Sequence, residues 1–149
     1  MTDPATARME ADRLLADRRS SARARTYAWH ALGIVARDAG DIAKAVHLFR
    51  WGLSLTRREE LRDRRRDLYA SLGTALALIG RRQAADDAFN AALGGARGGE
   101  RARILVRRGA ARANAGRPEE AWTDLRQAAA TLCRSHDDVW EARARTGAA

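Results

Sequence analysis

Several residue types are scarce in this 149-residue chain, and each scarcity excludes a class of protein. The single cysteine, Cys133, cannot form an internal disulfide, so the fold does not depend on an oxidising compartment. No run of 18 apolar residues occurs, and the start, MTDPATARMEADR, lacks the apolar core of a signal peptide. We therefore expect a cytoplasmic protein that does not use a membrane as its partner.

Proline and aromatic residues are also rare. The only prolines are Pro4 and Pro118, and aromatics make up 5% of the chain. Alanine and arginine are abundant instead, and both are good helix formers. A hydrophobic content of 46% is enough for a packed core in a chain of this length. The composition predicts one all-α domain over residues 1–149.

Lysine is nearly absent, since Lys44 is the only lysine among 28 basic residues. The net charge of +9 raises the question of a nucleic-acid surface. However, an excess of arginine over lysine follows from a GC-rich genome, and the arginines are interleaved with acids, as in RREELRDRRRD over Arg57 to Asp67. We interpret this segment as a solvated helix face with i,i+4 pairs such as Glu60 and Arg64. Nucleic acid is therefore disfavoured as the partner and kept as an alternative.

Residues that could carry chemistry are few and scattered. His30, His47 and His136 fall on different segments without paired-ligand spacing, whereas a metal site needs three or four converging ligands. Cys133 precedes His136 by three residues, and a nearby base can activate a thiol, but nothing in the sequence indicates an oxyanion site. We expect no enzymatic activity, no metal and no cofactor.

The chain does contain a spacing pattern that occurs three times. A glycine is followed after seven residues by a second glycine, after five more by an alanine, and after four more by a bulky apolar residue. The three copies are Gly33, Gly40, Ala45 and Phe49; Gly73, Gly80, Ala85 and Phe89; and Gly109, Gly116, Ala121 and Leu125. Repeats of this length indicate stacked helix pairs, a class of fold that binds other proteins.

Apolar residues recur at helical intervals on both sides of each second glycine, which suits the C-cap of a helix. We predict antiparallel helix pairs, the first over residues 25–56, the second over 59–95 and the third over 100–134. Residues 1–24 are expected to form an N-terminal helix that caps the first pair. Residues 137–149 are expected to start a further helix, and this unfinished repeat suggests that the native protein is longer.

The repeated small residues have a packing role. Gly33, Gly73 and Gly109, with the three alanines, are expected where the two helices of a pair cross, since a larger side chain would push the backbones apart. Phe49 and Phe89 would fill the space between successive pairs. Trp122 and Trp140 are expected to pack between helices as well.

With these positions placed, the chain resembles a tetratricopeptide repeat (TPR) protein. The resemblance covers roughly residues 25–133, and two repeats match the family pattern closely, whereas the third has Arg108 where leucine is expected. The repeats are also spaced by 40 and 36 residues rather than the family's usual spacing. The matching positions are Trp29, Leu32, Gly33, Gly40, Ala45, Phe49 and Gly52; Tyr69, Leu72, Gly73, Gly80, Ala85, Phe89 and Ala92; and Leu105, Gly109, Gly116, Ala121, Leu125 and Ala128.

The resemblance implies a right-handed solenoid of three helix-turn-helix repeats, with an N-terminal helix and a partial fourth repeat. Arg-Ala-rich phrasing such as RRGAARANAGRPEEAWTDLRQA is similar to the N-terminal TPR arrays of actinobacterial proteins that end in a caspase-like CHAT peptidase domain. No peptidase domain is present in these 149 residues.

In this family the first helix of each repeat lines a concave groove. The resemblance therefore implies a partner-binding groove made of Tyr27, His30, Ile34, Arg37, Asp67, Ser71, Thr74, Arg103, Arg107 and Asn114. Ala31 and Ser71 stand where carboxylate-clamping members have asparagine, which argues against a clamp for a terminal carboxylate. Arginines in the groove could still hold an acidic segment by bidentate contacts. Trp51 falls on a position that is usually polar, so we expect an exposed contact residue there.

We expect a non-catalytic protein-protein interaction module that binds a protein or peptide, with an acidic segment as one candidate partner. A larger effector such as a CHAT-type peptidase is a candidate setting for such a module. The alternatives are a nucleic-acid-binding helical repeat and a self-assembling scaffold that forms homo-oligomers through Trp51 or the face behind Trp140.

Overall fold

The computed structural model describes residues 3–57, 59–135 and 145–146. Within these residues the fold is all-helical, with no strand, and no helix is both long and apolar enough to cross a membrane. The helices are α1 (Pro4–Ala16), α2 (Ala22–Asp38), α3 (Ile42–Ser54), a 3-10 turn η1 (Glu59–Leu61), α4 (Arg62–Leu78), α5 (Arg82–Leu93), α6 (Gly98–Asn114) and α7 (Pro118–Ser135).

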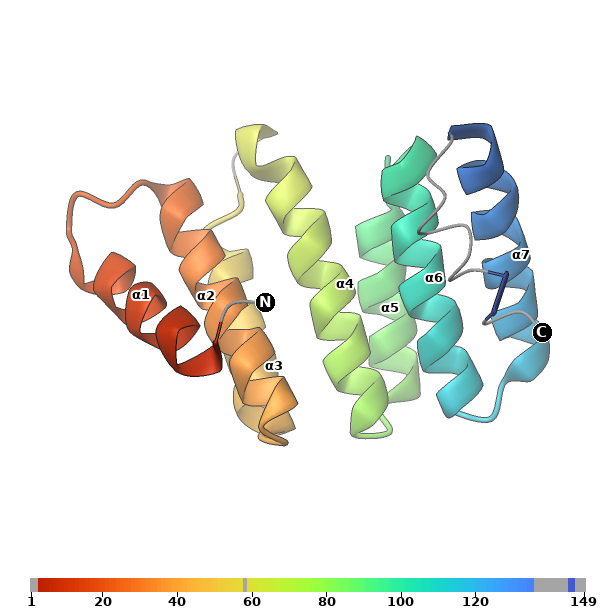
Figure 1. Ribbon diagram of the computed structural model, residues 1–149, viewed down its shortest axis with the longest axis horizontal. Coiled ribbons are helices and arrows are strands. Elements are labelled where there is room, and N and C mark those ends of the chain that lie inside the picture. Colours follow the sequence, from red (N-terminus) through yellow and green to blue (C-terminus); the bar gives the residue numbers. More distant parts are fainter. Residues whose placement is uncertain (1–2, 58, 136–144, 147–149) are drawn as a thin grey trace.

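The helices stack in chain order along the long axis of the molecule (Figure 1). Three antiparallel pairs follow one another, α2 with α3, α4 with α5, and α6 with α7, and α1 packs on α2 at one end. The first helices of the pairs lie side by side, because α4 contacts both α2 and α6. We call the surface formed by α2, α4 and α6 the first-helix face.

The turn inside each pair is built in the same way three times. Gly40, Gly80 and Gly116 adopt φ values of 85°, 72° and 72°, the left-handed region that favours glycine. In the first turn the Asp41 amide donates to the Ala36 carbonyl at 2.9 Å, and the other two turns repeat this bond at the same length. The glycines therefore end one helix with a Schellman motif and reverse the chain, as the sequence predicts.

The small residues lie at the helix crossings, which confirms the packing prediction. A side chain added at Gly73 would place its Cβ 2.9 Å from the Phe89 ring, and one at Gly109 would lie 2.9 Å from Leu125. Each glycine thus leaves room for the bulky residue of its own pair. The interpretation of Phe49 as filler only between pairs was too narrow, because its ring packs against Gly33 as well as in a core cluster with the second pair.

Two helix starts differ from the prediction. Helix α2 begins at Ala22, three residues before the expected start, because the Ser21 side chain accepts a hydrogen bond from the Ala24 amide at 3.1 Å and caps it. Helix α6 begins at Gly98 rather than at residue 100. The further helix expected over residues 137–149 lies, apart from residues 145–146, outside the described residues.

The third pair has an ion pair at two positions where the first pair has leucines. Arg108 occupies the position of Leu32 and Leu72, and it donates to both carboxylate oxygens of the buried Asp124 at 2.7 and 2.8 Å. Asp124 occupies the position of Leu48 in the first pair. The departure from the repeat pattern at Arg108 is therefore matched across the helix pair by a second departure.

The expectation that Trp122 packs between helices was wrong, because its side chain is 48% exposed. Asp86, at the same position of the preceding pair, contacts Arg112 of the next pair at 3.2 Å. The register therefore turns Trp122 toward the side on which a further pair would stack. Trp140 lies outside the described residues.

Candidate functional site

The helices α2, α4 and α6 together carry all ten residues predicted for the groove. Helix α2 supplies Tyr27, His30, Ile34 and Arg37; α4 supplies Asp67, Ser71 and Thr74; and α6 supplies Arg103, Arg107 and Asn114. Contacts of Arg64 and His30 connect four of them, Tyr27, His30, Asp67 and Ser71, into one polar floor. Ile34 lies apart, because it lines a pocket of about 400 Å³ with Pro4 and Ala7 of α1.

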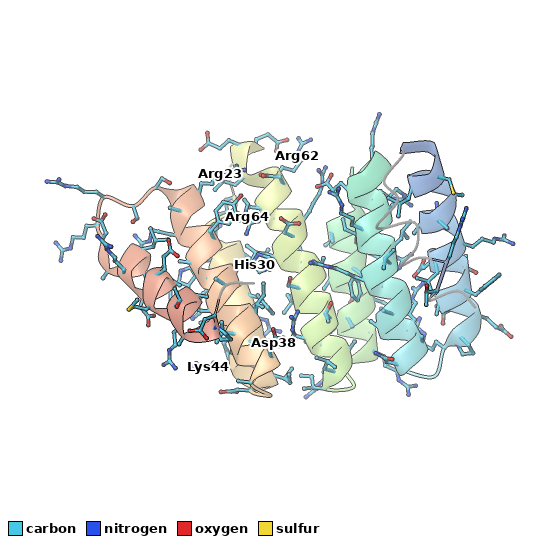
Figure 2. All side chains as sticks on the ribbon, viewed as in Figure 1. Arg23, His30, Asp38, Lys44, Arg62 and Arg64 are labelled. Carbon is cyan, nitrogen blue, oxygen red and sulfur yellow. The ribbon has the colours of Figure 1, made fainter. Side chains whose placement is uncertain are left out.

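Arg64 is the centre of the polar floor. Its guanidinium donates to His30 Nδ1 at 2.9 Å and to the Asp67 carboxylate at 2.8 Å, and it lies 3.7 Å from the centroid of the Tyr27 ring. Figure 2 shows Arg64 and His30 in the seam between α2 and α4. The residue is only 5% exposed, so it is a structural cation that joins these two helices.

The hydrogen bonds of His30 define its tautomer. A guanidinium can only donate, so the Arg64 bond requires a free lone pair on His30 Nδ1. The proton of the neutral ring therefore lies on Nε2, which donates to the Ser71 hydroxyl at 2.8 Å. The edge-to-face contact with Phe49, at 5.7 Å between centroids, holds the ring from below.

The surroundings of His30 keep it neutral. Burial lowers the pKa of His30 to about 3, with further lowering by the charges of Arg64, Arg107 and Arg37. These three arginines come from α4, α6 and α2, so each first helix contributes positive charge near this ring. The centre of the first-helix face is therefore a region of positive potential.

Arg107 differs from the other two arginines in its contacts. Arg37 pairs with Asp38 at 2.8 Å and Arg64 pairs with Asp67, whereas Arg107 makes no hydrogen bond or ion pair within the described part of the chain. Burial among the first helices lowers the pKa of Arg107, Asp67 attracts the guanidinium from a distance, and Arg37 repels it. Arg107 is nevertheless solvent-accessible, as expected for a cation on the wall of an open cleft.

A pocket of about 300 Å³ lies beside Arg107, between the C-terminal halves of α4 and α6. Its walls include Ala77, Leu78 and Ala110, and Leu78 is 56% exposed. Thr74 and Asn114 from the predicted groove also line it. The Thr74 hydroxyl already donates to the Ala70 carbonyl at 3.0 Å, so this part of the wall is mostly apolar.

Two predicted groove residues, Ser71 and Arg103, differ in exposure. Ser71 is 2% exposed, so its hydroxyl holds His30 instead of reaching a partner. Arg103 is exposed and lies about one turn before Arg107 on α6. Among the ten predicted residues, the exposed ones are Tyr27, Arg103, Arg107 and Asn114.

Trp51 lies on α3 and is 61% exposed, as the sequence predicts. Its ring stacks on Trp29 with 6.2 Å between centroids. The contact with Trp29 shows how the ring is held, and the role of Trp51 in binding stays a prediction.

The metal-ligating residue types do not gather in the described residues: no three of His, Cys, Asp and Glu are placed to hold a metal ion. Cys133 is exposed, and its sulfur accepts a hydrogen bond from Arg145 at 3.2 Å. His136, the other member of the suggested nucleophile pair, lies outside the described residues.

Comparison with known proteins relates this arrangement to a solved fold. The crystal structure of BtubC (BKLC) from P. vanneervenii superimposes with a TM-score of 0.70 over 97% of this chain, at 13% sequence identity. The likeness is one of fold alone. This chain spans 64% of the length of that protein. No protein-family model matches the chain, and no curated protein matches its sequence.

Arg64 and Leu78 are the residues of this face that sequence reasoning missed. Arg64 lies in the segment interpreted as a solvated helix face, yet it is buried and pairs with Asp67 rather than with Glu60. A signal was present, because Arg64, Asp67 and Ser71 share one face of a helix by their spacing. Leu78 lies at the end of α4, where the apolar pattern gave no sign that the side chain would be exposed.

Proposed function

We propose that the protein is a non-catalytic interaction module of the TPR type, a right-handed solenoid that binds an acidic protein segment on its first-helix face. The observation that carries the proposal is the convergence of Arg37, Arg64 and Arg107, from the first helices of three successive pairs, around a neutral His30. Arg107 supports it further, because a partly buried guanidinium without an ion pair gains most from a carboxylate. The fold likeness and the three identical turns favour the solenoid.

An acidic protein segment fits this face better than nucleic acid does. A phosphate backbone is bound by an extended stripe of cations, and its affinity falls steeply with salt. Here two of the three central arginines are already paired with Asp38 and Asp67. The remaining positive charge is local, which suits one or two carboxylates.

The test is the binding of a fluorescein-labelled oligoglutamate peptide, measured by fluorescence anisotropy. The double variant Arg103→Glu with Arg107→Glu should abolish binding without changing the helical circular dichroism. The matched control carries the same charge change on other helices, Arg50→Glu in α3 with Arg126→Glu in α7, both exposed. This control should bind the peptide within about threefold of the parent protein, because long-range charge is largely screened at physiological salt.

Equal loss of affinity in the two double variants would show that only net charge matters and would contradict the proposal. Tighter binding of a labelled oligothymidine than of oligoglutamate, with the salt dependence of phosphate contacts, would favour the nucleic-acid alternative instead.

A further inference from the structure

The first-helix face combines the polar floor with an apolar pocket, and one residue, Arg107, interacts with both. Arg107 interacts electrostatically with His30 and Asp67 of the polar floor and with Arg37. The same side chain lines the pocket of about 300 Å³ between α4 and α6. A ligand that contacts Arg107 with a carboxylate therefore lies at the mouth of this pocket.

The pocket itself fits an apolar side chain. Its volume is at the small end for ligand pockets, which suits one side chain of a peptide rather than a whole small molecule. Ala77, Ala110 and Ala111 keep its walls short, and Leu78 stands beside it with 56% of its surface exposed. An exposed leucine next to a pocket lined by alanines is covered most favourably by another apolar group.

Asn114 provides a polar group at the same pocket. It is exposed and lies two turns after Arg107 on α6, on the same helix face. An asparagine side chain can both donate to and accept from the peptide backbone. An extended segment crossing this pocket would therefore find a backbone partner on one side of the apolar group and a cation on the other.

From these positions we propose that the first-helix face binds a two-part acidic motif. In this motif an apolar side chain enters the pocket lined by Leu78, and a neighbouring carboxylate binds Arg107. The inference rests on the proposed function and adds which residue types of the bound peptide the first-helix face recognises. The partner is an extended peptide segment with a leucine-like residue close to aspartate or glutamate.

The experiment uses fluorescein-labelled Gly-Ser peptides that carry a leucine and a pair of aspartates at several short separations. Matched peptides replace the leucine by alanine or the aspartates by asparagines. At the best separation, the two-part peptide should bind about tenfold tighter than either matched peptide, since burial of a leucine and a charged hydrogen bond each contribute about a factor of ten.

Two pairs of variants locate the site. Arg107→Gln should lower the affinity for the two-part peptide to that of the asparagine peptide, whereas Arg126→Gln, on the exposed side of α7, should leave it unchanged. Ala110→Phe should fill the pocket and remove the advantage of leucine over alanine. Ala113→Phe, an exposed position of α6 outside the pocket, is its control.

Several outcomes would overturn the inference. If the aspartate peptide without leucine binds as tightly as the two-part peptide, and does so through Arg107, the acidic-segment function stands and the two-part motif is wrong. If the two-part peptide binds equally to all four variants, the site is elsewhere. If none of the peptides binds, the motif and the proposed function both fail.

Discussion

At the residue scale, the fold depends on three positions that carry no side chain. Gly33, Gly73 and Gly109 each face the bulky residue of the partner helix, so that the ring or branched side chain lies against bare backbone. Close helix contact of this kind gives the aromatic residues full burial: Phe49 is 0% and Phe89 is 1% exposed. The glycine recurs because the same helix packing recurs in each of the three pairs.

This packing predicts the effect of adding a side chain. Gly73→Val should lower the free energy of unfolding by about 1–3 kcal/mol, because its Cβ would meet the Phe89 ring at 2.9 Å and force the helices apart. The control is Gly99→Val in the first turn of α6, where the nearest atom to an added Cβ is 4.0 Å away. Urea unfolding measures both, and equal stability of the two variants would contradict the packing assignment.

His30 gives a second prediction at this scale. Its pKa is about 3 in the folded protein and about 6.5 when unfolded, so the unfolded chain binds a proton that the folded chain excludes. Stability from this residue is complete above pH 6.5 and is lost as the pH falls toward 3. His30→Gln, which does not titrate, should therefore show a shallower fall in stability between pH 6.5 and 4.5.

The measurement is urea unfolding of both proteins across that pH range. The difference between the two curves isolates His30 from carboxylates such as Asp63, whose pKa is also lowered in the folded protein: burial raises it, but the hydrogen bond and charge of Arg23 outweigh this effect. Parallel curves would show that His30 takes up a proton in the folded state.

At the element scale, the third helix pair adds buried ion pairs to its apolar core. Asp124 on α7 is 2% exposed and accepts hydrogen bonds from Arg108 and Arg112 of α6. Arg112 and Arg117 also reach Asp86 of α5, at 3.2 and 2.8 Å, which ties the third pair to the second. Removing one partner of a buried ion pair costs more free energy than the intact pair contributes to stability, because the other charge is left buried without a partner.

Because Arg108 and Asp124 are paired with each other, we expect the effect of replacing one to depend strongly on whether the other is present. Asp124→Leu alone should destabilise the protein by about 3–5 kcal/mol, because it leaves the Arg108 guanidinium buried without its carboxylate. Adding Arg108→Leu should recover most of this loss, since the double variant recreates the apolar pair of Leu32 and Leu48. Arg112 keeps Asp86 as its partner. Thermal and urea unfolding of the cycle test this, and additive losses would contradict it.

The helix pairs and their turns could be predicted from the sequence because their determinants are local. A glycine at positive φ and apolar residues at helical spacing act within one or two turns of the chain. Burial of Arg64 could not be predicted in this way. Its partners His30 and Tyr27 lie more than thirty residues earlier on α2, and only the packing of α2 on α4 decides which of several adjacent arginines becomes buried.

The site shows the same division between local and tertiary signals. The helix register placed Tyr27, Arg107 and Asn114 on one face, but it could not separate them from Ser71, which the structure buries beneath His30. Exposure of Trp51 followed from its register position, whereas the exposure of Trp122 did not, because none of the described helices covers its side chain. The helix register predicts which side of a helix a residue lies on, whereas its burial depends on the neighbouring helices.

At the scale of the whole molecule, the stack places like positions of successive pairs next to one another. Ion pairs cross between first helices at one end of the face, as between Arg23 and Asp63 at 2.5 Å and between Arg66 and Glu100 at 2.8 Å. These bonds fix α2, α4 and α6 as one surface, so that a ligand meets side chains from all three. The central claim is that this surface, rather than the outer helices, is where the partner binds.

The most direct measurement of that claim is an NMR titration of the 15N-labelled protein with the unlabelled oligoglutamate peptide. We expect the chemical-shift changes to fall on α2, α4 and α6, with the Nε–Hε signal of Arg107 among the largest. Changes concentrated on α3, α5 and α7, with the Arg107 signal unmoved, would show that the first-helix face is not the binding surface.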